Sequence, residues 1–286
     1  MKARRVRVKS KAMAAIAAIG ILAISVFGGC SSDTKDFADI MAKIPVGSAD
    51  FGYWDVGKLS KDADLAELYA AFRSSRQAQQ LVDIGGGLFV LERAARASGA
   101  DGEVTVLEGD LNRTDIERRL RENDYAETRY RETGIWSPRN GEGQDSVGLQ
   151  KNAMLMAGSD YLKLCIDTVA QEQAYSLYDD QYVRLLVDRL PQGLMVYVHK
   201  ADSASVQVYT DLIASGESYR KEGQDRLKLT AIYMFQDSDA AGKARMEIED
   251  QLNIKGFTDI KLGQDVNFVE VTALVYIVDF AQTLAF

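Results

Sequence analysis

Residues 227–236 read LKLTAIYMFQ and form the clearest strand pattern in the chain. Successive side chains of a strand point to opposite faces, and aromatic and β-branched residues favour this conformation. One face of the expected strand is therefore apolar, and it comprises Leu227, Leu229, Ala231, Tyr233 and Phe235. An apolar face of this length has to be covered by another element of the fold.

The residues that follow predict this cover. A helix opening at Ser238 would carry apolar side chains along one side, namely Ala241, Ala244, Ile248 and Leu252. Strands are expected at 258–262 and 268–278, and the second would have an apolar face made of Val269, Val271, Ala273, Val275 and Ile277. This order predicts an α+β fold in which helices cover mixed or antiparallel sheets.

A similar order is expected earlier in the chain. Its strand, helix, strand and further strand are predicted at 104–109, 114–122, 126–132 and from 146 onward. Two proline-led stretches, at 44–47 and 190–193, each precede a short strand. One hypothesis is an internal duplication, in which residues 37–190 and 191–286 are two similar α+β halves of approximate order β-α-β-α-β-β. The alternative is that α+β chains often alternate elements in this way without any duplication.

The N-terminus has the composition of a targeting segment. It contains six basic residues before an uncharged, mostly apolar run over 12–27 and the sequence Gly28-Gly29-Cys30. A basic stretch, an apolar stretch and small residues in this order indicate a signal peptide. Because a cysteine directly follows two small residues, the segment resembles a bacterial lipoprotein signal. That resemblance implies a signal peptide over 1–29, a lipid on Cys30 and a tether over 30–36.

The residues alone leave two alternatives for this segment. Residues 12–32 are 21 uncharged positions, and about 20 suffice to span a bilayer, so the segment could be an uncleaved anchor. It could also be an ordinary cleaved signal. All three hypotheses place the body on the extracytoplasmic side of the cell membrane.

Charge excludes one class of partner. The whole chain has 34 basic and 42 acidic residues. Loss of residues 1–29 would leave 28 basic against the same 42 acidic residues, a formal charge of −14. A nucleic-acid-binding protein needs a basic footprint, so we expect no nucleic-acid partner. The expected partners are the membrane, through the lipid, and a protein or small-molecule ligand.

A wider resemblance covers most of the remaining chain. The proline-led strand near the start, and Gly109-Asp110-Leu111 before a short charged helix, resemble uncharacterised families of secreted bacterial lipoproteins. Those families have no established activity. The resemblance therefore implies no functional residue beyond the lipid-bearing Cys30.

No motif predicts catalysis, a metal or a cofactor. The one histidine, His199, follows an apolar strand, and no Gly-x-Ser-x-Gly accompanies it. Zinc needs several Cys or His ligands, whereas the chain has only Cys30 and Cys165, the latter expected to be buried in a helix. The glycine runs 85–87 and 141–143 lack the spacing of a phosphate-binding loop.

Acidic pairs and aromatic residues have structural explanations as well. The pairs Asp179-Asp180 and Asp237/Asp239 lack EF-hand spacing, and the second flanks a helix start where capping is expected. The aromatic residues that could stack on a sugar or peptide, but that we expect to be largely core, are Tyr53, Trp54, Trp136, Tyr175, Tyr178 and Tyr182.

The leading hypothesis is a non-enzymatic binding or interaction module. The alternatives are an envelope hydrolase with paired carboxylates and a structural or assembly lipoprotein. A hydrolase predicts a cleft with two perturbed carboxylates, a small-ligand binder predicts an apolar or aromatic pocket with few titratable groups, and an assembly protein predicts a flat exposed apolar patch.

Overall fold

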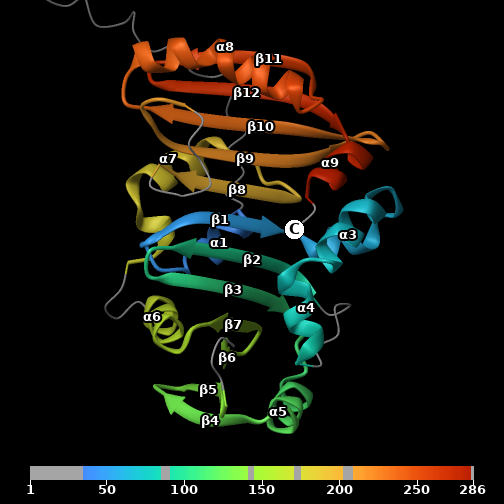
Figure 1. Ribbon diagram of the computed structural model, residues 1–286, viewed down its shortest axis with the longest axis vertical. Coiled ribbons are helices and arrows are strands. Elements are labelled where there is room, and N and C mark those ends of the chain that lie inside the picture. The colour runs from blue at the N-terminus through green and yellow to red at the C-terminus, as the bar shows by residue number, and fades with distance from the viewer. Residues whose placement is uncertain (1–34, 85–90, 141–144, 171–174, 202–208, 285–286) are drawn as a thin grey trace, which may run out of the picture. The chain divides into compact units, whose positions relative to one another are not determined.

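The computed structural model describes residues 35–84, 91–140, 145–170, 175–201 and 209–284. Within them, one sheet of 12 strands runs through the body, in the order β11-β12-β10-β9-β8-β1-β2-β3-β7-β6-β5-β4 (Figure 1). Every neighbouring pair is antiparallel. The predicted α+β class with antiparallel pairing is confirmed, with one continuous sheet in place of separate ones.

The strands are β1 (Ser48–Trp54), β2 (Leu91–Gly99), β3 (Gly102–Gly109), β4 (Tyr125–Tyr130), β5 (Thr133–Pro138), β6 (Ser146–Leu149), β7 (Ala153–Ala157), β8 (Met195–Lys200), β9 (Leu212–Glu222), β10 (Arg226–Phe235), β11 (Thr258–Asp265) and β12 (Phe268–Tyr276). The helices are α1 (Asp36–Met41), α2 (Val56–Lys61), α3 (Ala66–Arg73), α4 (Arg76–Asp83), α5 (Arg113–Glu122), α6 (Ser159–Val169), α7 (Gln181–Arg189), α8 (Ser238–Ile254) and α9 (Ile277–Thr283).

Helices cover both faces of the sheet, so the body has two apolar layers. One layer lies under α2, α3, α4, α5, α8 and α9, and the other lies under α1, α6 and α7. Alternation along the strands supplies both layers: Tyr53 belongs to the second and its neighbour Trp54 to the first. This confirms that these two aromatic residues point to opposite faces and that both are core.

Strands β10 and β12 pair with the apolar faces that the alternation of their side chains predicts. Leu229 lies opposite Ala273, and Tyr233 lies opposite Val269. All members of the two predicted apolar faces are buried in one cluster with the apolar side of α8. Asp237 caps that helix, because its carboxylate accepts a hydrogen bond of 2.8 Å from the Ala240 amide.

The two halves of the sheet have the same strand order. From the β1–β8 junction outward, one half runs β1, β2, β3, β7, β6 and the other runs β8, β9, β10, β12, β11. A helix follows the third strand in each half, α5 after β3 and α8 after β10. The common order is thus β-β-β-α-β-β and not the expected β-α-β-α-β-β. The first half adds β4 and β5 at its edge and a group of helices between β1 and β2.

Strand β9 accounts for much of this difference. The sequence pattern over 203–216 is mixed and fits a helix as well as strands, whereas the structure has a strand from Leu212 to Glu222. Residues 202–208 lie outside the described part. Strand β9 contains small residues where α7 packs close against it, and these residues interrupt the alternation of apolar and polar side chains that would identify a strand. A side chain added at Gly216 would come within 2.6 Å of the Leu190 side chain, and the Ser218 hydroxyl donates to the Pro191 carbonyl at 2.8 Å.

The described body begins within the predicted tether, because its last two residues, Lys35 and Asp36, already contact the rest of the fold. The Lys35 ammonium donates to the carbonyls of Val187 and Asp188 at the end of α7, and Asp36 pairs with Arg93 at 3.1 Å. The predicted signal segment and Cys30 lie outside the described residues. In the part of the chain that is described, none of the helices has the length and apolarity required to cross a membrane.

Candidate functional site

A cavity of about 310 Å³ lies between the sheet and helices α8 and α9, and we call it the aromatic pocket. Strands β9, β10 and β12 form its floor, and Figure 1 shows α8 lying across this part of the sheet and α9 beyond the end of β12. Its lining residues are Tyr209, Glu217, Tyr219, Tyr233, Gln251, Leu252, Lys255, Phe257, Val275, Phe280 and Thr283.

Strand alternation and pairing place the polar and aromatic groups of this pocket together. Glu217 and Tyr219 are two residues apart on β9, so their side chains share a face. Glu217 lies opposite the small Ala231 of β10, and Tyr233 follows two residues later on that strand. Phe280 reaches the same place because α9 starts directly after β12.

Two pairs of rings contribute to the wall of the pocket. The Tyr209 and Tyr233 rings meet edge to face, with 5.6 Å between their centroids. The Tyr219 and Phe280 rings lie 4.4 Å apart at an angle of 35°. Such pairs hold their rings in defined positions, so the pocket is shaped before any ligand arrives.

Among the residues that the structure describes, Glu217 is the one carboxylate that lines the aromatic pocket. The Tyr219 hydroxyl donates to its Oε2 at 2.6 Å, a length typical of a hydroxyl on a charged carboxylate. Glu217 is half-buried, and no lysine, arginine or histidine of the described residues forms an ion pair with it. The pocket therefore holds a carboxylate that a tyrosine, and not a cation, stabilises.

Burial in this region keeps the tyrosines protonated. It raises the pKa of Tyr219 and of Tyr233, and the nearby Glu217 charge adds to both shifts. Burial, with smaller contributions from Glu247 and Glu217, raises the pKa of Tyr209 to about 12. At neutral pH these side chains present hydroxyl groups and ring faces and no negative charge of their own.

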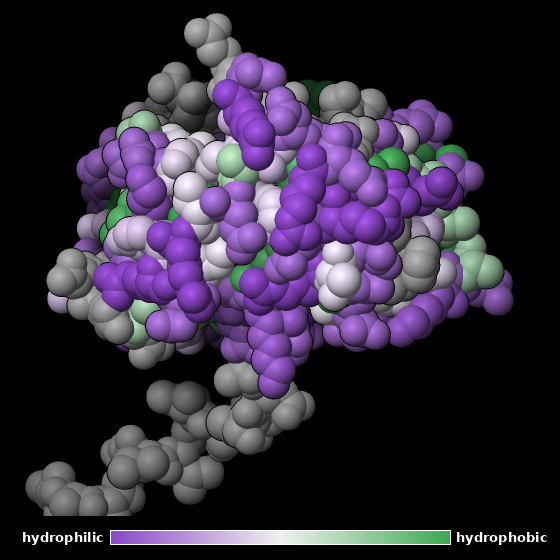
Figure 2. Space-filling view, turned by 90° about the horizontal axis from the view of Figure 1, so that it is seen from below, coloured by the Kyte–Doolittle hydropathy of each residue, from purple (hydrophilic) through white to green (hydrophobic). Residues whose placement is uncertain are grey.

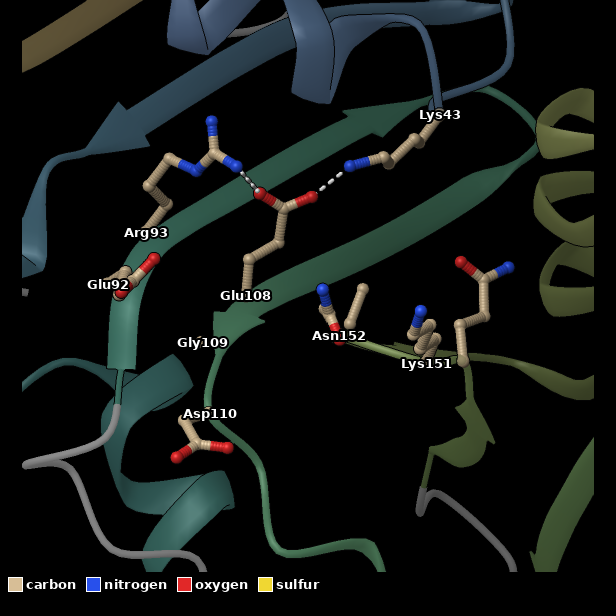
Figure 3. A pocket seen from close by; sticks show the side chains of 10 residues that line it. Lys43, Glu92, Arg93, Glu108, Gly109, Asp110, Lys151 and Asn152 are labelled. Carbon is tan, nitrogen blue, oxygen red and sulfur yellow. Dashed lines mark hydrogen bonds and ion pairs between the residues drawn. The ribbon is translucent and has the colours of Figure 1, made fainter.

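A second cavity, of about 470 Å³, lies near the ends of β2 and β3, and its lining is polar. Figure 3 shows the Glu108 carboxylate between the side chains of Lys43 and Arg93. The Arg93 guanidinium lies 2.8 Å from Glu108 and also pairs with Asp36 at 3.1 Å. Glu108 is buried, so these two cations neutralise a charge that would otherwise be costly inside the protein.

The remaining charged side chains of this polar cavity do not form a cluster. Its other charged side chains, Glu92, Asp110 and Lys151, are all exposed to water. In Figure 3 they lie apart from the Glu108 carboxylate and from one another. The Glu108 cluster is therefore an internal network of ion pairs that connects α1, through Asp36, with β2 and β3.

His199 forms part of the junction between the halves. It lies on β8, opposite Asp50 of β1, and its Nδ1 is 2.7 Å from the Asp50 carboxylate. The imidazole is 25% exposed. His199 therefore lies near the end of its strand but is only partly at the surface. Neither side chain lines the two cavities described above.

The two acidic pairs considered for calcium act as caps. Asp179 accepts from the Ser176 hydroxyl at 2.7 Å, and Asp180 accepts from two amides at the start of α7. Asp237 caps α8 as described above, and Asp239 lies in its first turn. Among the described residues, no group of three or more Asp, Glu, His or Cys side chains has the arrangement of a metal site.

The aromatic residues chosen from the sequence are mostly core, with one group that is not. Trp136 is buried, but Tyr175 is 76% exposed and Tyr182 is 39% exposed, so the expectation that they pack in the core was wrong. Tyr178 is partly buried, with the Arg184 guanidinium 5.3 Å from its ring centre. Cys165 is fully buried as expected, and burial raises its pKa to about 12.

Sequence reasoning missed the aromatic pocket itself. Tyr209, Glu217 and Tyr219 lie in or next to a stretch that was not recognised as a single strand. The available signal was the two-residue spacing of Glu217 and Tyr219, which places an acid and an aromatic ring on one face. That signal becomes useful only once the strand is aligned with β10.

The end of the body near β4 and β5 is predominantly hydrophilic. Figure 2 shows this side of the molecule, where hydrophobic residues occur singly between polar ones and do not merge into a broad patch. Helix α5 contributes charged side chains in ion pairs here, including Arg113 with Glu117 and Arg118 with Glu122. This face lacks the flat apolar surface expected of an assembly interface.

Comparisons with known proteins bear on the fold. Neither the models of protein families nor the curated protein sequences contain a match. Among solved structures, crystal form III of TP0453 superimposes with a TM-score of 0.58 at 9% identity, over 86% of this chain and 97% of that one. Crystal form I gives 0.56 at 10% identity, over 89% and 100%. At this level of identity the likeness shows a shared fold alone.

Proposed function

We propose that this chain is a lipid-anchored, extracytoplasmic binding protein whose body takes up a small molecule in the aromatic pocket. The signal-like N-terminus and Cys30 support the anchor, and the acidic charge expected of the mature chain suits a soluble body held beside a membrane. The single observation that carries the binding role is the pocket itself.

The pocket has the size and lining of a small-ligand site. Its volume of about 310 Å³ falls at the lower end of the range for such sites. Rings and aliphatic side chains form most of its lining, and a few polar groups, chiefly Glu217 and Gln251, stand among them. Of the three hypotheses drawn from the sequence, this arrangement favours the small-ligand binder.

The hydrolase alternative has less support. Two close carboxylate pairs share a cation and line neither of the two cavities described above. In the first, Asp62 and Asp64 both bind Lys221, at 2.7 and 2.6 Å. Asp265 and Glu270 both bind Arg189 in the same manner. The Lys221 hydrogen bond also lowers the pKa of Asp62, the opposite of what a general acid requires.

A plugged pocket tests the proposal. Thr283 is exposed at the pocket rim, so Thr283→Trp would place an indole in the opening without disturbing the core. The neighbouring Gln282 is also exposed but does not line the pocket, so Gln282→Trp is the control. The probe is neutral 3,3-dimethyl-1-butanol, measured by saturation-transfer NMR on the mature protein in phosphatidylglycerol nanodiscs, with empty nanodiscs subtracted.

We expect saturation transfer to the probe with the wild-type protein and with Gln282→Trp, and its loss with Thr283→Trp. An equal signal from all three proteins would mean that the probe binds elsewhere. No signal from the wild-type protein would reject the pocket as a binding site for small apolar molecules.

A further inference from the structure

The aromatic pocket has a charge pattern that identifies the class of its ligand. Glu217 is negative, and the rings of Tyr209, Tyr219 and Tyr233 stand around it as lining residues of the same cavity. The face of an aromatic ring carries partial negative charge and attracts cations. A carboxylate and three tyrosine rings therefore line one space of about 310 Å³.

Glu217 has a hydrogen bond but no ion pair among the described residues. A half-buried carboxylate is stabilised by hydrogen bonds or by a cation. Among the described side chains, Glu217 receives the Tyr219 hydroxyl and forms no ion pair. By contrast, Glu108, which is buried more fully than Glu217, is held between Lys43 and Arg93. A cation that enters the pocket would therefore meet a carboxylate that is not already paired with a described lysine, arginine or histidine.

The neighbouring strands extend the same pattern behind the pocket. Tyr197 of β8 lies directly opposite Glu217 in the sheet, and its ring meets Tyr219 edge to face at 6.1 Å. Burial raises the pKa of Tyr197, and the Glu217 charge raises it further. The Glu217 charge therefore raises the pKa of several neighbouring tyrosines, which stay protonated. Among the described residues of the pocket lining, no second carboxylate accompanies it.

We infer that the aromatic pocket binds an organic ammonium cation with a small apolar body. This inference rests on the proposed binding function and names the ligand class for the same site. The ammonium group would lie against Glu217 and the tyrosine faces, and the apolar part would contact Leu252, Phe257, Val275 and Phe280. The acidic charge of the mature chain would raise the local concentration of such a cation.

One lining residue opposes this assignment. Lys255 belongs to the pocket but is exposed at its rim, where water and salt screen its charge. An anionic ligand that used Lys255 would place its own charge near the Glu217 carboxylate. We therefore expect Lys255→Gln to raise cation affinity about twofold, as expected for the loss of a screened surface charge.

A series of probes with matched shape separates charge from apolar contact. The neutral member is 3,3-dimethyl-1-butanol. Choline replaces its quaternary carbon with nitrogen, 3,3-dimethylbutan-1-amine replaces its hydroxyl with a primary ammonium, and 3,3-dimethylbutanoate supplies an anion of similar form. Dissociation constants are measured by NMR titration of the mature protein in phosphatidylglycerol nanodiscs, which contain no ammonium headgroup.

We expect at least one cation to bind about tenfold more tightly than the alcohol, which corresponds to the strength of a desolvated cation–π and carboxylate site. Glu217→Gln should remove this preference and leave the affinity for the alcohol nearly unchanged. Glu249→Gln makes the same charge change at an exposed position of α8 that does not line the pocket, and it should keep the preference.

Each remaining outcome is informative. If the alcohol binds and neither cation binds more tightly, or the anion binds best, the ammonium assignment is overturned and the pocket keeps its proposed role. If no probe binds, the proposed function fails and the inference fails with it. Repeating the choline titration in nanodiscs with added phosphatidylcholine identifies the source: competition indicates a lipid headgroup, and its absence indicates a free ammonium compound.

Discussion

At the scale of single residues, polar side chains in this body mostly hold turns and helix ends. Asp179 is an example, because its carboxylate accepts both the hydroxyl and the amide of Ser176, at 2.7 and 2.9 Å. These hydrogen bonds favour the charged form and lower the pKa of Asp179 below its ordinary value of 3.8. The folded state therefore binds this proton less readily than the unfolded chain does.

The sign of the pH effect follows from that difference. The stabilisation by Asp179 is fully present above the unfolded pKa and is lost as the pH falls through the lower folded value. Asp179→Asn keeps the shape and removes the charge, so we expect it to cost on the order of 0.5–1 kcal/mol at pH 7. Urea unfolding from pH 7 to pH 2.5 should show this cost shrinking as the wild-type protein loses its own contribution.

Glu132→Gln is the matched control, since this side chain is 98% exposed. It should change the free energy of unfolding by less than about 0.5 kcal/mol at every pH. A cost of Asp179→Asn that stays constant down to pH 2.5 would argue against a role for its charge.

The sequence anticipated residue roles where local spacing determines them. Asp237 caps its helix as its position indicated, and Cys165 is buried because its helix faces the sheet. Tyr175 and Tyr182 were assigned to the core and are exposed. Helical spacing says which residues share a face, but only the packing of α7 determines which of its faces meets the sheet.

At the scale of elements, the β10–α8–β12 unit is the part of the fold that the sequence pattern predicts most directly. Ile248 of α8 is fully buried against the apolar faces of the two strands. We expect Ile248→Ala to lower the free energy of unfolding by about 3 kcal/mol, through lost transfer energy and the cavity left behind. Chemical denaturation monitored by circular dichroism measures this change.

Met246 of the same helix is 75% exposed and provides the control. Met246→Ala should change stability by less than about 0.5 kcal/mol. Equal losses from the two variants would contradict the orientation assigned to α8.

Elements with mixed composition were harder to predict from sequence. Strand β9 contains Ser215, Gly216 and Ser218, which are buried although they are small or polar, because α7 and the Pro191 carbonyl approach closely. Strand β5 contains Trp136 and ends at Pro138, and no sequence pattern identified residues 133–137 as a strand. Contacts between segments distant in the chain determine these strands, and a local pattern does not contain that information.

At the scale of the whole molecule, the sheet joins the two predicted halves without a break. Strands β1 and β8 pair from Asp50–His199 to Trp54–Met195, so the junction consists of backbone hydrogen bonds. The strand order is the same on both sides of this junction, and the duplication stays a prediction. The candidate site lies under α8 and α9, within the second half.

The anchor is a prediction about the complete chain. Protein purified from its native membrane should have its N-terminus at Cys30 and carry the mass of a diacylglycerol group or of three acyl chains. The Cys30→Ala variant should lack this mass. Intact-mass spectrometry checks both, and a full-length unmodified chain would instead identify residues 12–32 as a spanning segment.

The central claim is that a small molecule occupies the aromatic pocket, and the most direct measurement is a crystal structure of the protein soaked in 3,3-dimethyl-1-butanol. The account predicts new density among Tyr209, Tyr219 and Tyr233 under α8 and α9, and no such density in Thr283→Trp crystals. Density only in the polar cavity beside Glu108, or none at a saturating concentration, would contradict it.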